Sequence, residues 1–180
     1  LAANMPPDRV HVLCANRNGC PCCNSLAEAG MDPKEQGELQ RMMDITRATL
    51  YFAKAAILVE GISESLLIPV LAKPLGHDLG DKHISVIPIC GVAFETFKKI
   101  LHSEALSIPV ALVTDADPPV ERGDTWETET PEGTTTGSKI SDRTQKLLDL
   151  FVDHDTVSVF HSNLTLEYDL AEAGDPNAMT

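Results

Sequence analysis

Aromatic residues are scarce in this chain of 180 residues, because tryptophan, tyrosine and phenylalanine together make up only 4% of it. Hydrophobic residues still account for 43%, so we expect a core built mostly from aliphatic side chains. The chain also lacks an apolar run of about 18 residues, which a membrane-spanning helix needs, and no basic-then-apolar signal peptide opens it. We therefore expect no membrane association and a cytoplasmic location.

Basic residues are few as well. The chain has 14 Lys and Arg against 27 Asp and Glu, which gives a formal net charge of −13. Freestanding nucleic-acid-binding proteins hold phosphates with Lys and Arg, so this balance argues against that class. It does not argue against an acidic active site, where metal ions supply the positive charge. Any further grip on DNA would come from other parts of a larger parent protein.

The cysteines do not form a recognisable metal-binding pattern. An odd number without a secretory signal favours reduced thiols. The run Cys20-Pro21-Cys22-Cys23 has no second pair at zinc-ligand spacing, which favours unliganded thiols in a loop. The function of this cluster is left open. The five cysteines are Cys14, Cys20, Cys22, Cys23 and Cys90.

Short apolar runs alternate along the chain with segments of helical periodicity. A short, continuous apolar run is typical of a strand buried on both faces of a sheet. Strands that alternate with helices form parallel sheets through right-handed crossovers. The predicted fold is therefore α/β, with a central four-stranded parallel sheet and helices on both faces. We predict strands at 55–59, 84–89, 108–113 and 156–160, and helices at 34–52, 63–73, 93–101, 141–152 and 167–173.

Two segments lie outside this alternation. Residues 9–14 are rich in β-favouring side chains and predict a short strand, whereas 15–33 carries Asn, Gly, Pro and Cys and predicts a loop. The strand then has no evident partner. Residues 118–140 are acidic and rich in Gly, Thr and Pro, and they predict a long loop. Trp126 in this loop could either stack on a base or pack locally.

Carboxylates follow two of the predicted strands. Glu60 is the first polar residue after 55–59, and Asp115 and Asp117 come just after 108–113. The ends of parallel strands meet at one edge of a sheet, where ligands bind in such folds. Asp115 and Asp117 would project the same way if the chain stays extended. Clustered carboxylates repel one another, and oxygen ligands favour Mg²⁺, Mn²⁺ or Ca²⁺ over Zn²⁺. The pattern favours a divalent-metal site, with helix caps and surface charge as the alternatives.

Two neighbours of Glu60 add to this prediction. Gly61 has no side chain, which would let a phosphate or a metal approach the backbone closely. Glu64 lies four residues after Glu60, at the start of a helix that we expect Ser63 to cap. If the turn brings Glu64 back toward Glu60, it supplies a fourth carboxylate.

Several separated motifs occur in a characteristic order and together resemble the Toprim domain, which primases, topoisomerases, recombination proteins and certain nucleases share. More narrowly, they are similar to the Toprim part of the OLD-family (overcoming lysogenization defect) ATP-dependent endonucleases. The resemblance extends over about 34–174, which is most of the chain. The motifs are Tyr51-Phe52-Ala53-Lys54, Glu60-Gly61-x-x-Glu64, Gly91-Val92-Ala93-Phe94, Val113-Thr114-Asp115-Ala116-Asp117 and Leu164-Thr165-Leu166-Glu167-Tyr168-Asp169-Leu170.

The resemblance implies a Toprim-like (Rossmann-like) sandwich that acts as a metal-dependent DNA endonuclease, or nickase, module. It implies that Glu60 is a metal ligand or general base and that Asp115 and Asp117 are metal ligands. Glu64 and Glu167 resemble the further carboxylates with which OLD nucleases bind two ions, Mg²⁺ or Mn²⁺. Two such ions activate the attacking water and stabilise the leaving oxygen.

The resemblance also implies a domain organisation. Residues 1–33 would be a remnant or linker from a preceding ATPase domain, and 34–180 the Toprim nuclease domain, with a C-terminal part of the parent missing. The chain has no Gly-x-x-x-x-Gly-Lys-Ser/Thr loop, so ATP would act only through that ATPase domain. The implied partners are DNA and the ATPase domain, and a homodimer stays open. We expect the catalytic basic residue beyond residue 180, with Lys139 and Arg143 as candidates within the chain.

Two alternatives use the same fold differently. The domain could be a nucleic-acid binding or assembly module without hydrolysis, as in recombination mediators that resemble it. It could also be a topoisomerase or primase domain. A topoisomerase needs a nucleophilic tyrosine, and the sequence offers only Tyr51 and Tyr168 without an evident partner. A primase would bring a zinc ribbon, which is lacking. For the isolated chain we expect weak metal binding and little or no nuclease activity.

Overall fold

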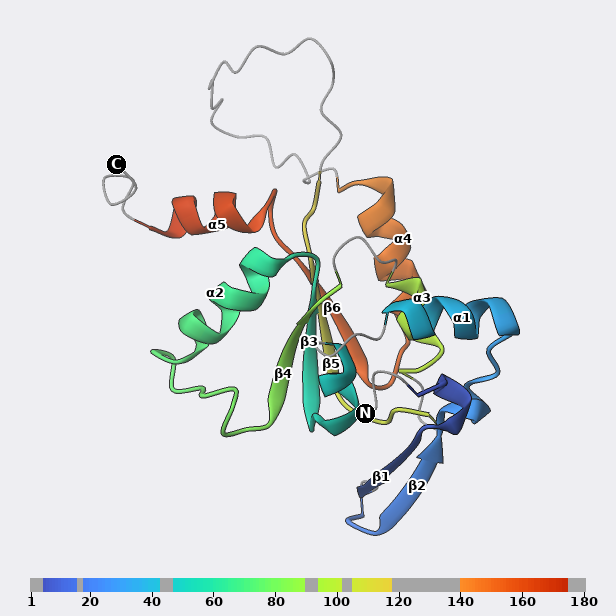
Figure 1. Ribbon diagram of the computed structural model, residues 1–180. Coiled ribbons are helices and arrows are strands. Elements are labelled where there is room, and N and C mark those ends of the chain that lie inside the picture. Colours follow the sequence, from blue (N-terminus) through green and yellow to red (C-terminus); the bar gives the residue numbers. More distant parts are fainter. Residues whose placement is uncertain are drawn as a thin grey trace.

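A four-stranded parallel sheet lies at the centre of the computed structural model, which describes residues 5–15, 18–42, 47–89, 94–101, 105–117 and 140–174. The strand order is β4-β3-β5-β6, and all neighbours are parallel (Figure 1). The predicted sheet is therefore confirmed. Its strands are β3 (Ala55–Val59), β4 (Ile84–Pro88), β5 (Val110–Thr114) and β6 (Val157–His161).

The order of the strands reverses between β3 and β5. The chain passes from β3 through α2 (Ile62–Ala72) to β4, and then returns to the other side of β3 through α3 (Glu95–Lys98) to form β5. Helix α4 (Asp142–Phe151) leads on to β6, and α5 (Leu166–Ala173) comes next. A reversal of this kind leaves a crevice at the carboxyl ends of the two central strands, where ligands bind in open α/β sheets.

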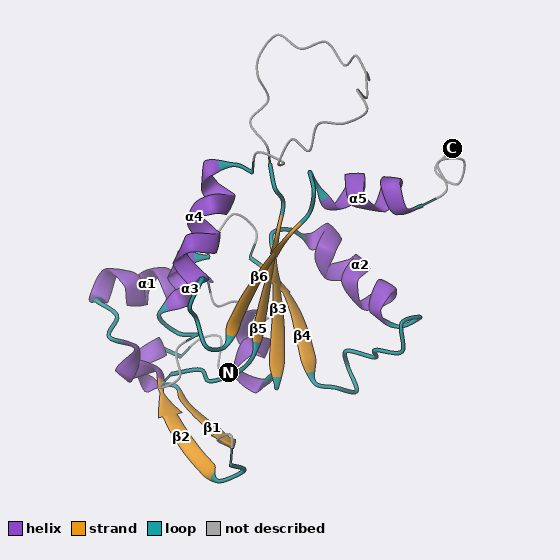
Figure 2. Ribbon diagram, turned by 180° about the vertical axis from the view of Figure 1, so that it is seen from behind, coloured by secondary structure: helices purple, strands orange, loops and turns teal. Residues whose placement is uncertain are grey.

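Helices lie on both sides of the sheet, as predicted. Helix α2 lies on one side, whereas α1 (Pro33–Met42), α3 and α4 lie on the other (Figures 1 and 2). The main core is on the second side, because burial alternates along β5 and places Val110 and Leu112 there. Its helical contribution includes Leu39, Phe97, Leu101, Leu147 and Phe151, all buried.

The side of the sheet that carries α2 is less completely covered. Helix α2 has no fully buried residue. Its apolar side chains Ile62, Leu66 and Val70 recur at helical spacing, and each is more than 60% exposed. Helix α2 contacts β4 and β3, so it covers that half of the sheet.

The N-terminal region departs from the prediction. Residues 15–33 were expected to be a loop, but β2 (Pro21–Ser25) pairs antiparallel with β1 (His11–Ala15), so the first strand has a partner within the chain. Gly19, with φ 75°, lies in the connection between the two strands. A 3₁₀ helix, Leu26–Ala29, then places Leu26 in the core. Cys22 and Cys23 therefore lie in a hairpin strand, and another 3₁₀ turn, Pro7–Arg9, precedes β1.

Three predicted helices differ from the structure. The expected helix at 34–52 is α1, which ends at Met42, and a separate 3₁₀ helix at Arg47–Phe52. Gly61, rather than Ser63, occupies the N-cap position of α2, and Pro69 lies inside that helix without ending it. The expected helix at 93–101 is shorter, since α3 covers only Glu95–Lys98.

Some predictions concern residues outside the described part of the chain. These are the loop at 118–139 with Trp126 and Lys139, and the turn residues 91–93. Among the described helices, none combines the length and the apolar character that crossing a membrane would require.

Candidate metal centre

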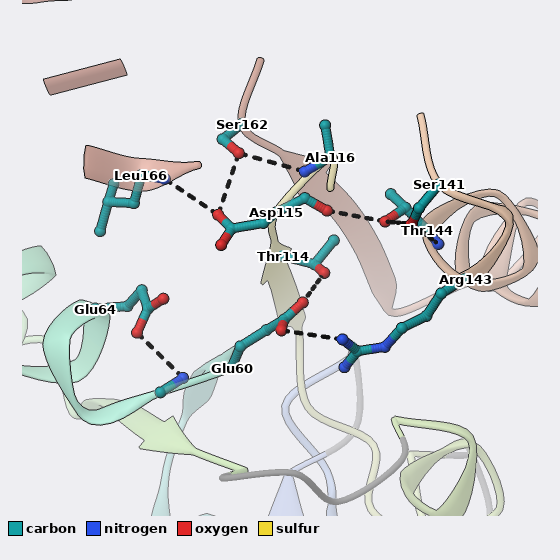
Figure 3. A network of polar contacts seen from close by, with 11 residues as sticks. Glu60, Glu64, Thr114, Asp115, Ala116, Ser141, Arg143, Thr144, Ser162 and Leu166 are labelled. Carbon is teal, nitrogen blue, oxygen red and sulfur yellow. Dashed lines mark hydrogen bonds and ion pairs between the residues drawn. The ribbon is translucent and has the colours of Figure 1, made fainter. Parts of the chain in front are cut away.

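Glu60 directly follows β3 and lies beside the end of β5. Its carboxylate has a different partner on each oxygen (Figure 3). The Thr114 hydroxyl, at the last position of β5, donates to Oε1. The Arg143 guanidinium, from the first turn of α4, donates to Oε2 at 3.3 Å. Because the Glu60 side chain is only 21% exposed, these contacts fix its direction toward β5 and α4.

Asp115 directly follows β5 and is held by the segment after β6. Its Oδ1 accepts hydrogen bonds from the Ser162 hydroxyl at 3.2 Å and from the Leu166 amide at 3.1 Å (Figure 3). Leu166 is the first residue of α5, so Asp115 satisfies one of the amides that a helix start leaves unpaired. Asp115 thus joins β5 to the start of α5.

The pKa of Asp115 is raised above its ordinary value. Burial is the largest cause, since it disfavours the charged form, and the hydrogen bonds from Ser162 and Leu166 oppose it. The negative charges of Glu60 and Asp117 raise the pKa of Asp115 further. Glu60 and Asp117 therefore each repel a negative charge on Asp115, and a cation bound there would relieve this repulsion.

Glu64 lies in the first turn of α2 and turns back on the backbone. Its Oε2 accepts a hydrogen bond from the Gly61 amide at 3.1 Å. A Cβ atom at Gly61 would lie 2.9 Å from this oxygen, which is too close for an undisturbed contact. Gly61 therefore permits the close approach of Glu64, and its role in admitting a phosphate stays a prediction.

Asp117 and Glu167 are the two remaining predicted metal ligands, and both are exposed. The chain does not stay extended after β5, because Asp117 has φ 43°. The condition under which Asp115 and Asp117 would project the same way is therefore not met. Asp117 is exposed, and its amide donates to the Leu164 carbonyl at 3.3 Å. Glu167 is exposed in the first turn of α5.

We refer to Glu60, Glu64, Asp115 and Asp117 as the carboxylate cluster. Within the described residues, no three His, Cys, Asp or Glu side chains already converge closely enough to hold a metal ion. The donor atoms nevertheless suit a hard cation, because they are carboxylate oxygens. The negative charges of Glu60 and Asp117 also raise the pKa of Asp115. The assignment of these residues as metal ligands stays a prediction.

Sequence reasoning did not identify the hydroxyl groups that hold the cluster. The Thr144 hydroxyl donates to the Asp115 carbonyl at 2.8 Å (Figure 3). The Ser141 amide donates to the Ala116 carbonyl at 2.8 Å, so α4 is fixed to the end of β5. Ser162 could have been found, since it directly follows β6 just as Glu60 and Asp115 follow their strands. Arg143 was a sequence candidate for a basic residue, and the structure places it against Glu60.

Comparison with known families supports the resemblance. Residues 51–117 match the family model described as "Overcoming lysogenization defect protein-like, TOPRIM domain". The resemblance to the OLD Toprim domain is therefore confirmed over this segment, which contains the whole carboxylate cluster. Glu167 and Arg143 lie outside the match. Among curated proteins, none matches the chain.

Solved structures give the same picture. The C-terminal region of the Burkholderia pseudomallei OLD protein is 28% identical, with a TM-score of 0.51 over 68% of this chain and 60% of that one. A C-terminal region of the Xanthomonas campestris pv. campestris OLD protein is 25% identical, with a TM-score of 0.50 over 73% of this chain and 60% of that one. The fold is thus of the Toprim type. The chain spans about three fifths of the length of these structures.

Proposed function

We propose that this chain is the Toprim nuclease module of an OLD-type, ATP-dependent DNA endonuclease, which hydrolyses or nicks the phosphodiester backbone with divalent cations. One observation carries the proposal. Glu60 and Asp115 follow the two strands between which the sheet order reverses, and Glu60 raises the pKa of Asp115. Both residues lie inside the segment that matches the OLD-like Toprim model.

The residues have distinct proposed tasks. Glu60, Asp115 and Asp117 would hold a first Mg²⁺ or Mn²⁺, and Glu64 and Glu167 would serve a second. Bound ions would activate a water and stabilise the leaving oxygen of the phosphodiester. Glu60 also suits a general base, since it is partly buried and held by two neighbours. Ser162 orients Asp115, whose Oδ2 has no such contact among the described residues and stays available to a cation.

We also propose the substrate, the partner domain and the location of the protein. DNA is the substrate, a preceding ATPase domain of the parent is the partner through which ATP acts, and 1–33 links the two. We place the protein in the cytoplasm.

Within this fold, one observation disfavours a topoisomerase. Tyr51 is buried and its pKa is raised to about 12 by that burial, so it is poorly placed to attack DNA. Tyr168, 47% exposed on α5, is the other tyrosine.

The test has two stages. Calorimetric titration of the chain with Mn²⁺ or Mg²⁺ is expected to show binding that Asp115→Asn removes. Asp153→Asn is the matched control, because Asp153 is exposed beyond α4 and the substitution changes the net charge equally. Supercoiled plasmid is then incubated with the parent protein and either metal, and nicking is expected to disappear in Asp115→Asn. Nicking that survives would refute the metal-site assignment, and no nicking with any metal would favour the binding module.

A further inference from the structure

Arg143 is a basic side chain in direct contact with the carboxylate cluster. The described ion pairs join Lys73 to Asp78, Lys99 to Glu35 and Arg143 to Glu60, so only Arg143 pairs with a member of the carboxylate cluster. Its Nη1 lies 3.3 Å from Glu60 Oε2, although 83 positions separate the two residues in sequence. This contact occupies one of the two carboxylate oxygens that Glu60 could offer to a cation.

The backbone under Arg143 is fixed relative to the cluster. Two hydrogen bonds at the start of α4, from Ser141 to Ala116 and from Thr144 to Asp115, tie this helix to the end of β5. The Arg143 side chain itself is 58% exposed, so it can change partner without moving the helix. The guanidinium therefore stays within reach of the site whatever it contacts.

Once a metal ion binds, the charges of the metal and of the Arg143 guanidinium decide which anion Arg143 contacts. A divalent ion at Glu60 and the guanidinium repel each other and compete for the same oxygen. A planar guanidinium also matches the oxygens of a phosphate and binds them with two parallel hydrogen bonds. A displaced Arg143 would find a DNA phosphate next to the metal. The chain has a net charge of −13 and offers few other cations for that phosphate.

We propose that Arg143 couples metal binding to DNA binding: it is the counter-ion of Glu60 until a cation takes that carboxylate, and it then binds a phosphate of the DNA backbone. This inference rests on the proposed metal-dependent nuclease function. It makes Arg143 a DNA-binding residue with two alternating partners. Because coupling between two ligands is reciprocal, DNA strengthens metal binding by as much as the metal strengthens DNA binding.

Metal titration without DNA tests the first half. Arg143→Gln removes the competitor, so the chain is expected to bind Mn²⁺ about two- to fivefold more tightly, the range expected for an exposed ion pair. Lys146→Gln is the matched control, since Lys146 is exposed on the same helix and its loss changes the net charge equally. Tighter binding in Arg143→Gln alone supports the proposal. Unchanged or weaker binding, or an equal gain in Lys146→Gln, overturns it.

Metal titration with a short DNA duplex tests the second half. In the wild-type chain and in Lys146→Gln the duplex is expected to raise Mn²⁺ affinity, and in Arg143→Gln this increase is expected to be lost. An increase that persists in Arg143→Gln, or a duplex without effect on the wild type, contradicts the phosphate contact. Asp115→Asn separates the two proposals. If metal affinity is unchanged in Asp115→Asn, the metal site itself is refuted. If Asp115→Asn loses metal affinity but the metal affinity of Arg143→Gln equals that of the wild type, only the coupling is refuted.

Discussion

The Ser162 hydroxyl donates a hydrogen bond to Asp115 Oδ1 at 3.2 Å, and this contact joins the segments that follow β5 and β6. It is one of the two hydrogen bonds that hold the pKa of Asp115 down against burial and the neighbouring negative charges. Together with the Leu166 amide, this hydroxyl therefore orients the Asp115 carboxylate and favours its charged form. This relationship makes the site testable without removing any carboxylate.

Ser162→Ala is expected to raise the pKa of Asp115 further, because the variant loses a hydrogen bond to the charged form. Protons then compete better with the cation, so Mn²⁺ affinity should fall by about two- to tenfold, and more at acidic than at neutral pH. Calorimetric titration at two pH values measures this. Ser158→Ala, an exposed position on β6, is the control. A loss independent of pH, or an equal loss in the control, would contradict the prediction.

The raised pKa of Asp115 has a consequence for folding. The folded state holds this proton more tightly than the unfolded chain does, so the contribution to stability is present at low pH and is lost as the pH rises through the folded-state pKa. In buffer with a chelator, Asp115→Asn should therefore raise the Tm relative to the wild type at about pH 7. The gain should shrink as the pH falls toward the ordinary value of 3.8.

Thermal unfolding followed by circular dichroism measures this pH dependence. Asp153→Asn again matches the change in net charge at an exposed position. Asparagine keeps an oxygen that can accept from Ser162 and Leu166, so the hydrogen bonds themselves are preserved. The prediction is wrong if Asp115→Asn lowers the Tm at neutral pH or if both variants shift it equally.

Gly61 and Glu64 should behave as one unit. Gly61→Ala places a Cβ 2.9 Å from Glu64 Oε2, and the flexible carboxylate must swing away and give up its hydrogen bond to the backbone. We expect a loss of about 0.5–1.5 kcal/mol in the free energy of unfolding, the usual value of one such bond. Urea unfolding of Gly61→Ala, Glu64→Ala and the double variant measures it. The double variant should lose less than the sum of the two, and strict additivity would show that they act independently.

Much of the sheet could be predicted because burial leaves a local trace. The run 55–59 is apolar throughout, and it coincides with β3. Strand β2 leaves no such trace, since Pro21-Cys22-Cys23-Asn24-Ser25 lacks β-branched residues and is defined by its pairing with β1. The prediction of a single helix at 34–52 was wrong because the local sequence pattern does not distinguish two kinds of helix. Apolar residues three or four apart suit an α-helix and a 3₁₀ helix alike, and the second form occurs at Arg47–Phe52.

The candidate site could be predicted only as far as the strand ends. Glu60 and Asp115 follow buried strands, so the parallel topology alone brings them to one edge. Their partners Thr114, Ser162 and Arg143 depend on which strands are neighbours, and the order β4-β3-β5-β6 is not encoded in any local pattern. Strand β5 ends at Thr114, and Asp117 has φ 43°, so Asp117 does not continue the alternation of the strand. Local alternation predicts side-chain direction only while the strand continues.

Thr144 provides a test of whether α4 supports the site. Its side chain is 2% exposed, and its hydroxyl donates to the Asp115 carbonyl at 2.8 Å. Thr144→Val keeps the shape but leaves that carbonyl without its donor, which should cost about 1–3 kcal/mol of unfolding free energy. Thr144→Ser keeps the hydroxyl and loses only a methyl group, so it should cost about 1 kcal/mol or less.

The two Thr144 variants also separate support of the site from stability of the fold. If the hydrogen bond positions Asp115, Thr144→Val should weaken Mn²⁺ binding at a temperature where the variant is fully folded, whereas Thr144→Ser should bind as the wild type does. Calorimetry on samples shown to be folded by circular dichroism makes this comparison. Wild-type metal affinity in Thr144→Val would mean that α4 stabilises the fold without positioning Asp115. Arg143 would then reach Glu60 from a helix that has no other influence on the cluster.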